Sequence, residues 1–293
     1  MRIYTIKIDN EEKVAIGYKN SDNIYLVEDF GFNFKSVNDL IQNATASQME
    51  KLKDINNANY PIIKDSVQIL APIPHPLQDI ICLGVNYADH AEEAVKYNED
   101  NIGKERSHTV YFSKRVNEAV PPGGNIPLYE GLVDSLDYEV ELGLVIGKDA
   151  KNISKEEAHK YILGYTIIND VSARNVQMQH SQWYLGKSFD GFTPMGPCIV
   201  SADEIADCGN LELVCYVNGE CRQKSNTKML IKKIPEIIEE LSKGMTLKAG
   251  TIIATGTPAG VAFSFNPPKY LKDGDKVECR IEKIGSLRNI VKK

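Results

Sequence analysis

The stretch SLDYEVELGLVIG, residues 135–147, decides how the fold is interpreted. Its second half is rich in Val, Leu and Ile and closes on a glycine, which predicts a β-strand. In its first half, Asp137, Glu139 and Glu141 occupy every second position. Because alternate residues of a strand point to the same face, the sequence predicts a strand with three carboxylates on one face. The opposite face carries Tyr138, Val140 and Leu142.

An acidic strand face needs either solvent or a cation, because an unpaired carboxylate buried in a core costs several kcal/mol. The strand alone leaves both interpretations open, an exposed face and a metal site. Asp170 ends the apolar stretch TIIND, residues 166–170, at the C-terminal edge of a second predicted strand. Together with Glu139 and Glu141 it forms an all-oxygen set, which favours Mg²⁺ or Mn²⁺. Zinc is not expected, since no His or Cys stands at ligand spacing.

Composition narrows the class of protein. The 293 residues are 42% hydrophobic and 25% charged, which is typical of a soluble globular chain. The net charge of -6 argues against nucleic acid as a partner, because phosphate binding needs a basic surface. We expect no membrane association, since no stretch approaches the roughly 20 apolar residues of a membrane span. The start lacks a signal peptide and the six scattered cysteines form no CxxC pair, so we expect reduced thiols and a cytoplasmic location.

The pattern of elements predicts two parts. Residues 1–70 read as a small N-terminal β-rich accessory domain with short strands and a helix over 36–55, capped by Ser36 or Asn38. The proline-rich stretch LAPIPHPLQD marks the boundary to residues 71–293. Strands dominate that larger part without a regular βαβ alternation, so we predict a mainly β (α+β) core with peripheral helices. Those helices are expected over 154–162, 171–180 and 231–244, and the VNGE stretch predicts an Asn-Gly hairpin turn.

Two residues in the stretch GVNYADHAEEA, residues 84–94, point to proton transfer. His90 and Glu93 stand at i and i+3, so on a helix they share a face. A carboxylate that is hydrogen-bonded to one ring nitrogen fixes the tautomer and leaves the other nitrogen as a base. A surface pair with no catalytic role is the alternative, and this spacing alone does not separate the two.

Two irregular loops offer groups that could bind an anion. Lys187 lies in LGKSFDGFTPMGP, where glycines and prolines hold an irregular chain, and an exposed lysine in a turn is the alternative. Thr257 lies in ATGTPAGV after a predicted strand. That loop lacks the spacing of a P-loop, so we interpret it as a backbone cradle for a carboxylate with Thr257 as a hydroxyl donor.

Five motifs, in this order, resemble the fumarylacetoacetate hydrolase family from about residue 71 to the C-terminus. They are LGVNYADHAEEA, LDYEVELGLVIG, YTIINDVSARNVQ, QWYLGKSFDGFTPMGP and GTIIATGTPAGV. The resemblance implies a mixed β-roll fold, a homodimer, and Mg²⁺ or Mn²⁺ in the active site. The N-terminal region resembles the accessory domain that many members carry.

The resemblance also assigns residues to functions. It places the metal on Glu139, Glu141 and Asp170, with Asp137 as an accessory acid. The catalytic residues that it implies are His90, Glu93, Lys187 and Gln177. Thr257 is a substrate-binding residue. Arg174 is interpreted first as a residue that braces the loop through a salt bridge, and substrate binding is the alternative. Lys114, in YFSKR, is predicted to bind a distal carboxylate of the substrate, unless it is an exposed charge at a strand end.

The implied activity is cleavage of a C–C bond in a 2-oxo acid or 1,3-diketo acid, as in an acylpyruvate hydrolase. The metal would stabilise the enolate, and the His90–Glu93 pair would activate a water. Lys187 and Gln177 would stabilise the developing oxyanion. The same groups also serve a decarboxylase or isomerase of 2-oxo diacids, such as oxaloacetate or a 2-hydroxymuconate, and a sugar-acid dehydratase or lyase. A metal-stabilised binding protein without catalysis is the alternative outside enzymes.

Two segments bear on the substrate. Residues 91–112 are highly charged and are interpreted as a lid over the pocket. Phe263 and Phe265 stand where many members of the family are rich in glycine. Packing in the core or in a dimer is the preferred interpretation of both rings. The alternative is that they line the pocket mouth and favour a substrate with an apolar tail.

Overall fold

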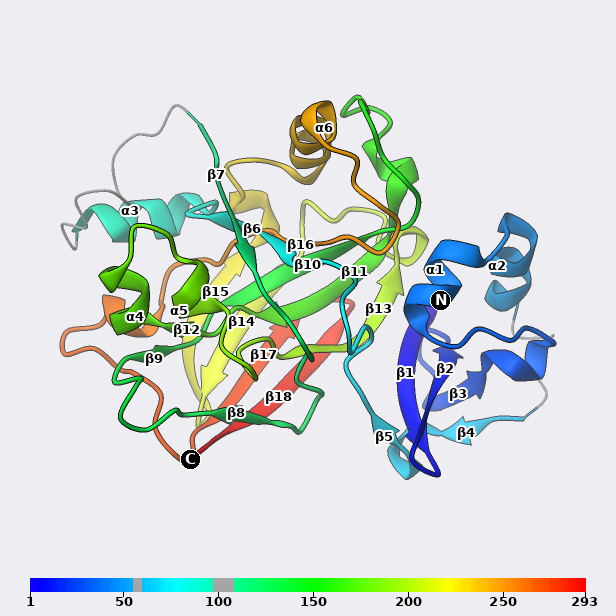
Figure 1. The fold of residues 1–293 in the computed structure, drawn as a ribbon, viewed down its shortest axis with the longest axis horizontal. Helices are drawn as coiled ribbons and strands as arrows, with labels where there is room; N and C mark the ends of the chain where they lie inside the picture. The colour runs from blue at the N-terminus through cyan, green and yellow to red at the C-terminus, as the bar shows by residue number, and fades with distance from the viewer. Residues whose placement is uncertain (55–59, 97–107) are drawn as a thin grey trace.

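The computed structural model describes residues 1–54, 60–96 and 108–293, and strands form most of its regular structure (Figure 1). One large sheet runs in the order β4 (Ile62–Ile63), β3 (Asn23–Leu26), β2 (Glu11–Gly17), β1 (Arg2–Ile8), β13 (Met195–Ser201), β11 (Ile162–Asn169), β10 (Val140–Ile146), β16 (Ile252–Ala254), β6 (Ile80–Gly84) and β7 (Val110–Lys114), with β5 (Gln68–Ile69) beside β1. The second sheet contains β15 (Glu220–Asn226), β14 (Glu212–Val217), β17 (Lys276–Ile281), β18 (Gly285–Lys292) and β8 (Asn125–Pro127). A short pair joins β9 (Leu136–Asp137) to β12 (Ser172–Ala173).

The helices are short and lie outside the sheets. They are α1 (Val37–Asn43), α2 (Ala46–Lys53), α3 (Ala88–Lys96), α4 (Arg174–Gln179), α5 (Tyr184–Lys187) and α6 (Ile234–Gly244). Figure 1 shows α1 and α2 with β1–β3 at one side of the molecule, and α3, α4 and α5 at the opposite side. Most strand pairs are antiparallel, but β16–β6 and β18–β8 are parallel. The mainly β, mixed fold with peripheral helices is therefore confirmed.

The two sheets pack face to face and enclose the larger core. Strands β10 and β11 contact β14 and β17, and the apolar face of β10 is buried there. That face continues the series Tyr138, Val140 and Leu142, as predicted. On the other face, Val145 belongs to a second core that α1 and α2 help to cover. Both faces of β10 are thus removed from water, which explains why its apolar run is nearly continuous.

The prediction of one uninterrupted acidic strand is wrong at its start. Regular pairing with β11 begins at Val140, while Asp137 belongs to the separate β9–β12 pair. Glu139 lies between the two strands, and its backbone N–H donates to Asn169 Oδ1 rather than to a strand partner. The chain therefore bends between Asp137 and Glu141, so the three carboxylates do not form one regular row.

Two helix predictions also differ from the structure. The helix expected over 36–55 is two helices, because Thr45 interrupts it and caps α2 in a capping box with Gln48. Ser36 caps α1, as expected. The helix expected over 154–162 is reduced to one 3₁₀ turn at Ala158–Tyr161. The Tyr161 carbonyl accepts from the Gly147 N–H, so this end of the segment is already tied to the strands.

The N-terminal region adds strands to the same large sheet. Arg2 and Ile3 of β1 pair with Val200 and Ile199 of β13, so the sheet continues across the proline-rich stretch. The division into residues 1–70 and 71–293 stays a prediction. The hairpin turn is confirmed, since Asn218 and Gly219 both have positive φ, of 53° and 83°. Within the described residues, no helix has the length and apolar character that crossing a membrane requires.

Candidate active site

Three acidic side chains meet in the interior at the ends of β10 and β11. Glu139, Glu141 and Asp170 are buried, and each offers an oxygen within 4.8 Å of the others. The antiparallel pairing of β10 with β11 brings them together, because it sets Val140 opposite Asn169. The Asp170 N–H then donates to the Glu139 carbonyl at 2.9 Å. The backbone register therefore determines the spacing of the carboxylates.

Two buried lysines neutralise part of this charge. Lys187 Nζ lies 2.7 Å from both Glu139 Oε2 and Asp170 Oδ2. Lys114 Nζ donates to Asp170 Oδ1 at 2.6 Å and to the Val171 carbonyl at 3.0 Å. Burial opposes ionisation of Asp170, but the two ammonium groups lower its pKa to about 2. Burial opposes the charged form of Lys187, but the carboxylates of Asp170 and Glu139 raise its pKa above the usual value.

Glu141 lacks such a partner. It accepts a hydrogen bond from the Gly256 N–H at 2.7 Å, but among the described residues no Lys or Arg forms an ion pair with it. Burial, together with repulsion from Asp170 and Glu139, raises its pKa well above the usual range. A divalent cation would offset this charge, and three carboxylates are the ligands that Mg²⁺ or Mn²⁺ prefers. The residues present therefore fit the expected metal.

The remaining acid of the opening stretch has its own counter-charge. Arg174, at the start of α4, donates through Nε to Asp137 Oδ2 at 2.8 Å and through Nη2 to Glu139 Oε1 at 2.6 Å. Its Nη1 donates to Gln177 Oε1 at 2.9 Å. All three guanidinium nitrogens are therefore engaged by protein groups. This is the bracing arrangement preferred above for Arg174, and it leaves Asp137 outside the metal triad.

His90 and Glu93 form the expected pair on α3. His90 Nδ1 and Glu93 Oε2 lie 3.0 Å apart, and Glu93 Oε1 accepts from the Gly260 N–H at 3.0 Å. Burial opposes ionisation of Glu93, but hydrogen bonds from His90, Ser264 and Gly260 hold its pKa below the usual value. A carboxylate at this position makes Nδ1 the protonated nitrogen, so Nε2 of His90 is the nitrogen that can accept a proton.

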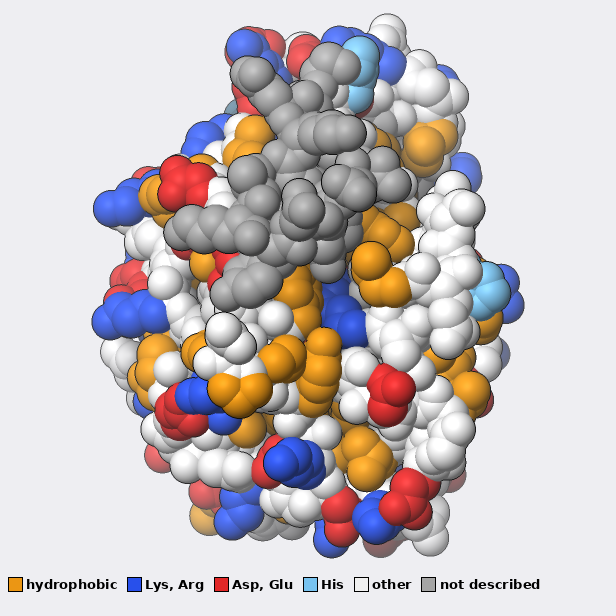
Figure 2. Space-filling view, turned by 90° about the vertical axis from the view of Figure 1, so that its left-hand side faces the viewer, with side chains coloured by type: hydrophobic (Ala, Val, Ile, Leu, Met, Phe, Trp, Pro, Cys, Tyr) orange, Lys and Arg blue, Asp and Glu red, His pale blue; other side chains and the backbone are white. Residues whose placement is uncertain are grey.

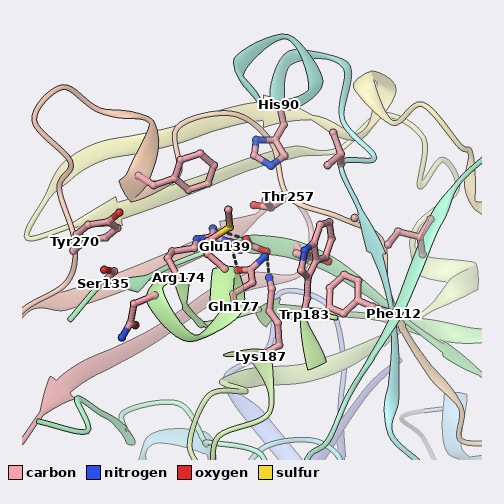
Figure 3. Close-up of a pocket in the computed structure, with 17 residues that line it drawn as sticks. His90, Phe112, Ser135, Glu139, Arg174, Gln177, Trp183, Lys187, Thr257 and Tyr270 are labelled. Atoms are coloured by element: carbon pink, nitrogen blue, oxygen red, sulfur yellow. Dashed lines mark hydrogen bonds and ion pairs between the residues drawn. The ribbon is translucent and has the colours of Figure 1, made fainter. Parts of the chain in front are cut away.

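One cavity contains members of both groups: His90 of the pair and Glu139 and Glu141 of the triad line it, whereas Glu93 and Asp170 do not. It has a volume of ≈ 210 Å³ within the described residues, below the about 300–1,000 Å³ of sites for drug-sized ligands. Figure 3 shows His90 across it from Lys187 and Glu139, with Thr257 between them in this view. Figure 2, which looks onto the side of α3 and α4, shows hydrophobic side chains bordering a hollow that contains a basic group. The size suits a small acid.

The two ends of the cavity differ in chemistry. Tyr270 and Ser135 lie at one end, and Phe112 and Trp183 lie at the other (Figure 3). None of these four residues was predicted from the sequence. A signal was present for Trp183, because the single Trp of the chain precedes Lys187 by four residues and so shares its helical face.

Lys114 is buried beside Asp170. Its side chain is 1% exposed, and its ammonium group donates to the Asp170 carboxylate. It does not line the cavity, so the structure gives no support to contact with a distal carboxylate, and that contact stays a prediction. The alternative of an exposed charge at a strand end is wrong, because the side chain is buried. The predicted site residues that do line the cavity are His90, Glu139, Glu141, Arg174, Gln177, Lys187 and Thr257.

Phe263 and Phe265, the two rings considered above, occupy different environments. Phe263 lines the cavity and its ring lies under the Arg174 guanidinium, 4.9 Å from the ring centroid. Phe265 packs instead against Arg222 and Lys269 and does not line the cavity. The preferred packing interpretation is therefore corrected for Phe263. Residues 97–107 of the predicted lid lie outside the described residues.

Gly84→Ala is expected to disturb the aromatic end of the cavity. A Cβ at this position would lie 2.3 Å from Trp183 Cζ3, so the indole must move. We expect a loss of about 1–3 kcal/mol in the free energy of unfolding, as for other overpacked sites. Urea titration measures it, and the emission spectrum of the single Trp reports the indole. Gly244→Ala, at an exposed glycine with no atom within 4 Å of its Cβ, controls for the added methyl group. An unchanged emission spectrum would contradict this packing.

Comparison with known proteins agrees with the motifs. Residues 79–292 match the family described as Fumarylacetoacetate (FAA) hydrolase C-terminal. Oxaloacetate tautomerase YisK of Bacillus subtilis (strain 168) is 46% identical over 226 residues, which are 76% of this chain and 72% of that protein. The solved fumarylacetoacetate hydrolase of Exiguobacterium antarcticum has 36% identity and a TM-score of 0.85, covering 100% of this chain and 99% of its own. Maleylpyruvate hydrolase from Sphingobium sp. SYK-6, solved with manganese (II) and pyruvate, has 25% identity and a TM-score of 0.78, covering 100% and 99%.

Proposed function

The chain belongs to the fumarylacetoacetate hydrolase family, and from this premise we propose that it is a divalent-metal-dependent enzyme that moves a proton on a small 2-oxo acid. The reaction that we propose is keto–enol tautomerisation of a 2-oxo diacid, with oxaloacetate as the test substrate. The observation that carries the proposal is the position of His90, which is hydrogen-bonded to Glu93 and shares one small cavity with Glu139 and Glu141 of the carboxylate triad. The 46% identity to an oxaloacetate tautomerase supports the choice of reaction.

The metal site would consist of Glu139, Glu141 and Asp170. A divalent cation bound there supplies Lewis acidity, which polarises the 2-oxo group and makes the neighbouring C–H more acidic. The presence of manganese in the maleylpyruvate hydrolase structure supports a metal of this kind, and the choice between Mg²⁺ and Mn²⁺ belongs to the proposal.

His90 would transfer the proton. Its Nε2 takes the proton from the carbon beside the 2-oxo group, and the electron pair of that C–H bond becomes the C=C bond of the enol. The same imidazolium then returns the proton to the oxygen, so atoms and charge balance. The Glu93 carboxylate, 3.0 Å from Nδ1, stabilises the imidazolium between the two transfers.

Two side chains are placed to stabilise the oxygen that gains charge. Gln177 Oε1 already accepts from Arg174, so the amide offers its Nε2 hydrogens to the cavity. Lys187 contributes a buried positive charge beside Glu139 and Asp170. Preorganised donors of this kind act strongly in a site that excludes water.

The test follows the decay of enol oxaloacetate by its ultraviolet absorbance. Purified protein with Mn²⁺ should accelerate the decay above the buffer and metal blanks. EDTA should abolish the acceleration, and restored Mn²⁺ or Mg²⁺ should recover it. Incorporation of solvent deuterium at the carbon beside the 2-oxo group, measured by NMR, gives an independent reading. A rate that never exceeds the metal blank would contradict the proposal.

Acylpyruvate hydrolysis is the second candidate. The same His90 Nε2 that accepts a proton from carbon can take one from water, and the similarity to a maleylpyruvate hydrolase favours this reaction. Acetylpyruvate would then give pyruvate and acetate, and ¹⁸O from labelled water would appear in the acetate. Release of CO₂ from oxaloacetate would instead indicate a decarboxylase. Tight binding of these acids without any turnover would indicate a binding protein.

Assembly and location stay predictions. The homodimer that the family resemblance implies is tested by size-exclusion chromatography with light scattering. The expected cytoplasmic location is tested by fractionation of the source cells.

A further inference from the structure

One short loop is hydrogen-bonded to both the carboxylate triad and the His90–Glu93 pair. Within residues 256–260, the Gly256 N–H donates to Glu141 Oε2 at 2.7 Å, and the Gly260 N–H donates to Glu93 Oε1 at 3.0 Å. Thr257, between them, lines the cavity. The position of this loop therefore affects the metal carboxylates and the proton-transfer pair at the same time.

Gln223 of the second sheet holds this loop in place. It is 0% exposed, and its Oε1 accepts from the Val140 N–H at 3.0 Å. Its Nε2 donates to Thr257 Oγ1 at 2.8 Å and to the Pro258 carbonyl at 2.9 Å. One amide thus connects the loop to the start of β10, next to Glu139 and Glu141.

The loop is seated closely on the strand that carries Gln223. A Cβ on Gly260 would lie 2.0 Å from the Arg222 carbonyl oxygen, and Gly260 has a φ of +98°. Only glycine permits this approach with this backbone conformation. The contact with β15 therefore fixes the distance between the loop and the strand, and this distance lets the Gln223 side chain bond to the loop.

The amide also determines what the Thr257 hydroxyl can do. An amide nitrogen only donates, so Thr257 Oγ1 accepts from Gln223 and must direct its single hydrogen elsewhere. In the structure that hydrogen goes to the Val140 carbonyl at 3.1 Å, which is long against the about 2.7–2.8 Å typical of O–H···O bonds. Such a weak bond is readily exchanged for a stronger one to a carboxylate.

We propose that Gln223 is a positioning residue that makes Thr257 a hydrogen-bond donor to the carboxylate of the 2-oxo acid. The inference rests on the proposed function for the identity of the ligand. Gln223 itself does not line the cavity, so it acts through Thr257.

Gln223→Glu tests the direction of the hydrogen bond. An ionised carboxylate only accepts, so it would draw the Thr257 hydrogen toward itself and turn a lone pair toward the ligand. With oxalate as the probe and the Mn²⁺-loaded protein, calorimetry should show about tenfold weaker binding, the scale of one charge-assisted hydrogen bond. Gln68→Glu, at an exposed position of β5, controls for the added charge.

A double-mutant cycle separates this effect from a general disturbance. Thr257→Val removes the hydroxyl and should weaken oxalate binding by a similar factor. When Gln223→Glu is added to the Thr257→Val variant, it should cause less than about a twofold further loss. An equal loss in both backgrounds would overturn the role assigned to Gln223.

Further outcomes distinguish this inference from the proposed function. Wild-type protein that binds Mn²⁺ but not oxalate would overturn both. Oxalate binding that is unchanged both in Gln223→Glu and in Gln223→Met, whose thioether cannot donate a hydrogen bond, would overturn only the inference. If Gln223→Glu does not fold, Gln223→Met replaces it, and the backbone N–H groups of Gly256, Thr257, Ala259 and Gly260 should exchange hydrogen faster than in the wild type. Unchanged exchange together with unchanged oxalate binding in Gln223→Met would equally overturn the inference.

Discussion

Glu141→Gln is expected to abolish metal-dependent activity while it stabilises the metal-free protein. Glu141 is the one carboxylate of the triad without a Lys or Arg partner among the described residues, so its charge is the most costly to bury. Gln keeps an oxygen for the Gly256 N–H but has no charge for the cation. We expect Mn²⁺ affinity to fall by at least about 100-fold, since even residues that only orient a ligand change it 10–100-fold.

The gain in stability should be seen only without metal. Removing an uncompensated buried charge should raise the free energy of unfolding by roughly 1–3 kcal/mol in EDTA. Glu92→Gln, at an exposed position of α3, is the matched control and should change neither quantity. Metal affinity is measured by calorimetry and stability by urea denaturation. A variant that is less stable in EDTA than the wild type would contradict this account of Glu141.

The pH dependence of the free energy of unfolding tests whether the charge of Glu141 destabilises the metal-free protein. Burial, with repulsion from Asp170 and Glu139, raises the pKa of Glu141 in the folded protein. An acid with a raised pKa binds more protons when folded, so the metal-free wild type should lose stability as pH rises above the unfolded value of about 4.3. Gln does not titrate. The curve of free energy against pH should therefore be flatter for Glu141→Gln, and parallel curves would contradict the assignment.

The carboxylates were predictable because their signal is local. Glu139 and Glu141 stand two residues apart on a strand, and Asp170 ends the strand that pairs with it, so spacing and strand ends were sufficient. The break after Asp137 was not predictable in this way. It depends on Arg174, which lies 37 residues away and holds Asp137 in a salt bridge of its own.

Lys114 and Gln223 show where sequence patterns stop being informative. A lysine at the end of VYFSK looks like an exposed strand end, and its burial follows from Asp170, 56 residues later. Gln223 lies in ECRQKSN, whose polar residues are typical of an exposed hairpin strand. This side chain points inward because β14, which pairs with β15, packs against β10, where the Val140 N–H meets Gln223 Oε1. Buried polar residues of this kind are identified by their partners, which lie on other elements.

His90→Asn is expected to remove proton transfer and leave the metal site intact. The Asn amide can still donate to Glu93, but it offers no basic nitrogen to the cavity. We expect kcat/KM for enol oxaloacetate to fall by about 10²–10⁴, the usual contribution of a general acid–base residue. Mn²⁺ affinity should stay within about threefold of the wild type, because His90 is outside the triad of carboxylates. Stopped-flow absorbance and calorimetry measure the two quantities.

The pairing of variants decides which reaction the cavity performs. His159→Asn, at an exposed position, controls for the loss of an imidazole and should behave as the wild type. Glu93→Gln should give a smaller loss than His90→Asn, because it weakens the support of the imidazolium but leaves the base in place. Tautomerisation that survives His90→Asn while Mn²⁺ still binds would contradict the proton-transfer role. If His90→Asn still releases CO₂ from oxaloacetate at the wild-type rate, the reaction is decarboxylation. Loss of CO₂ would need the cation at the triad but no base at position 90.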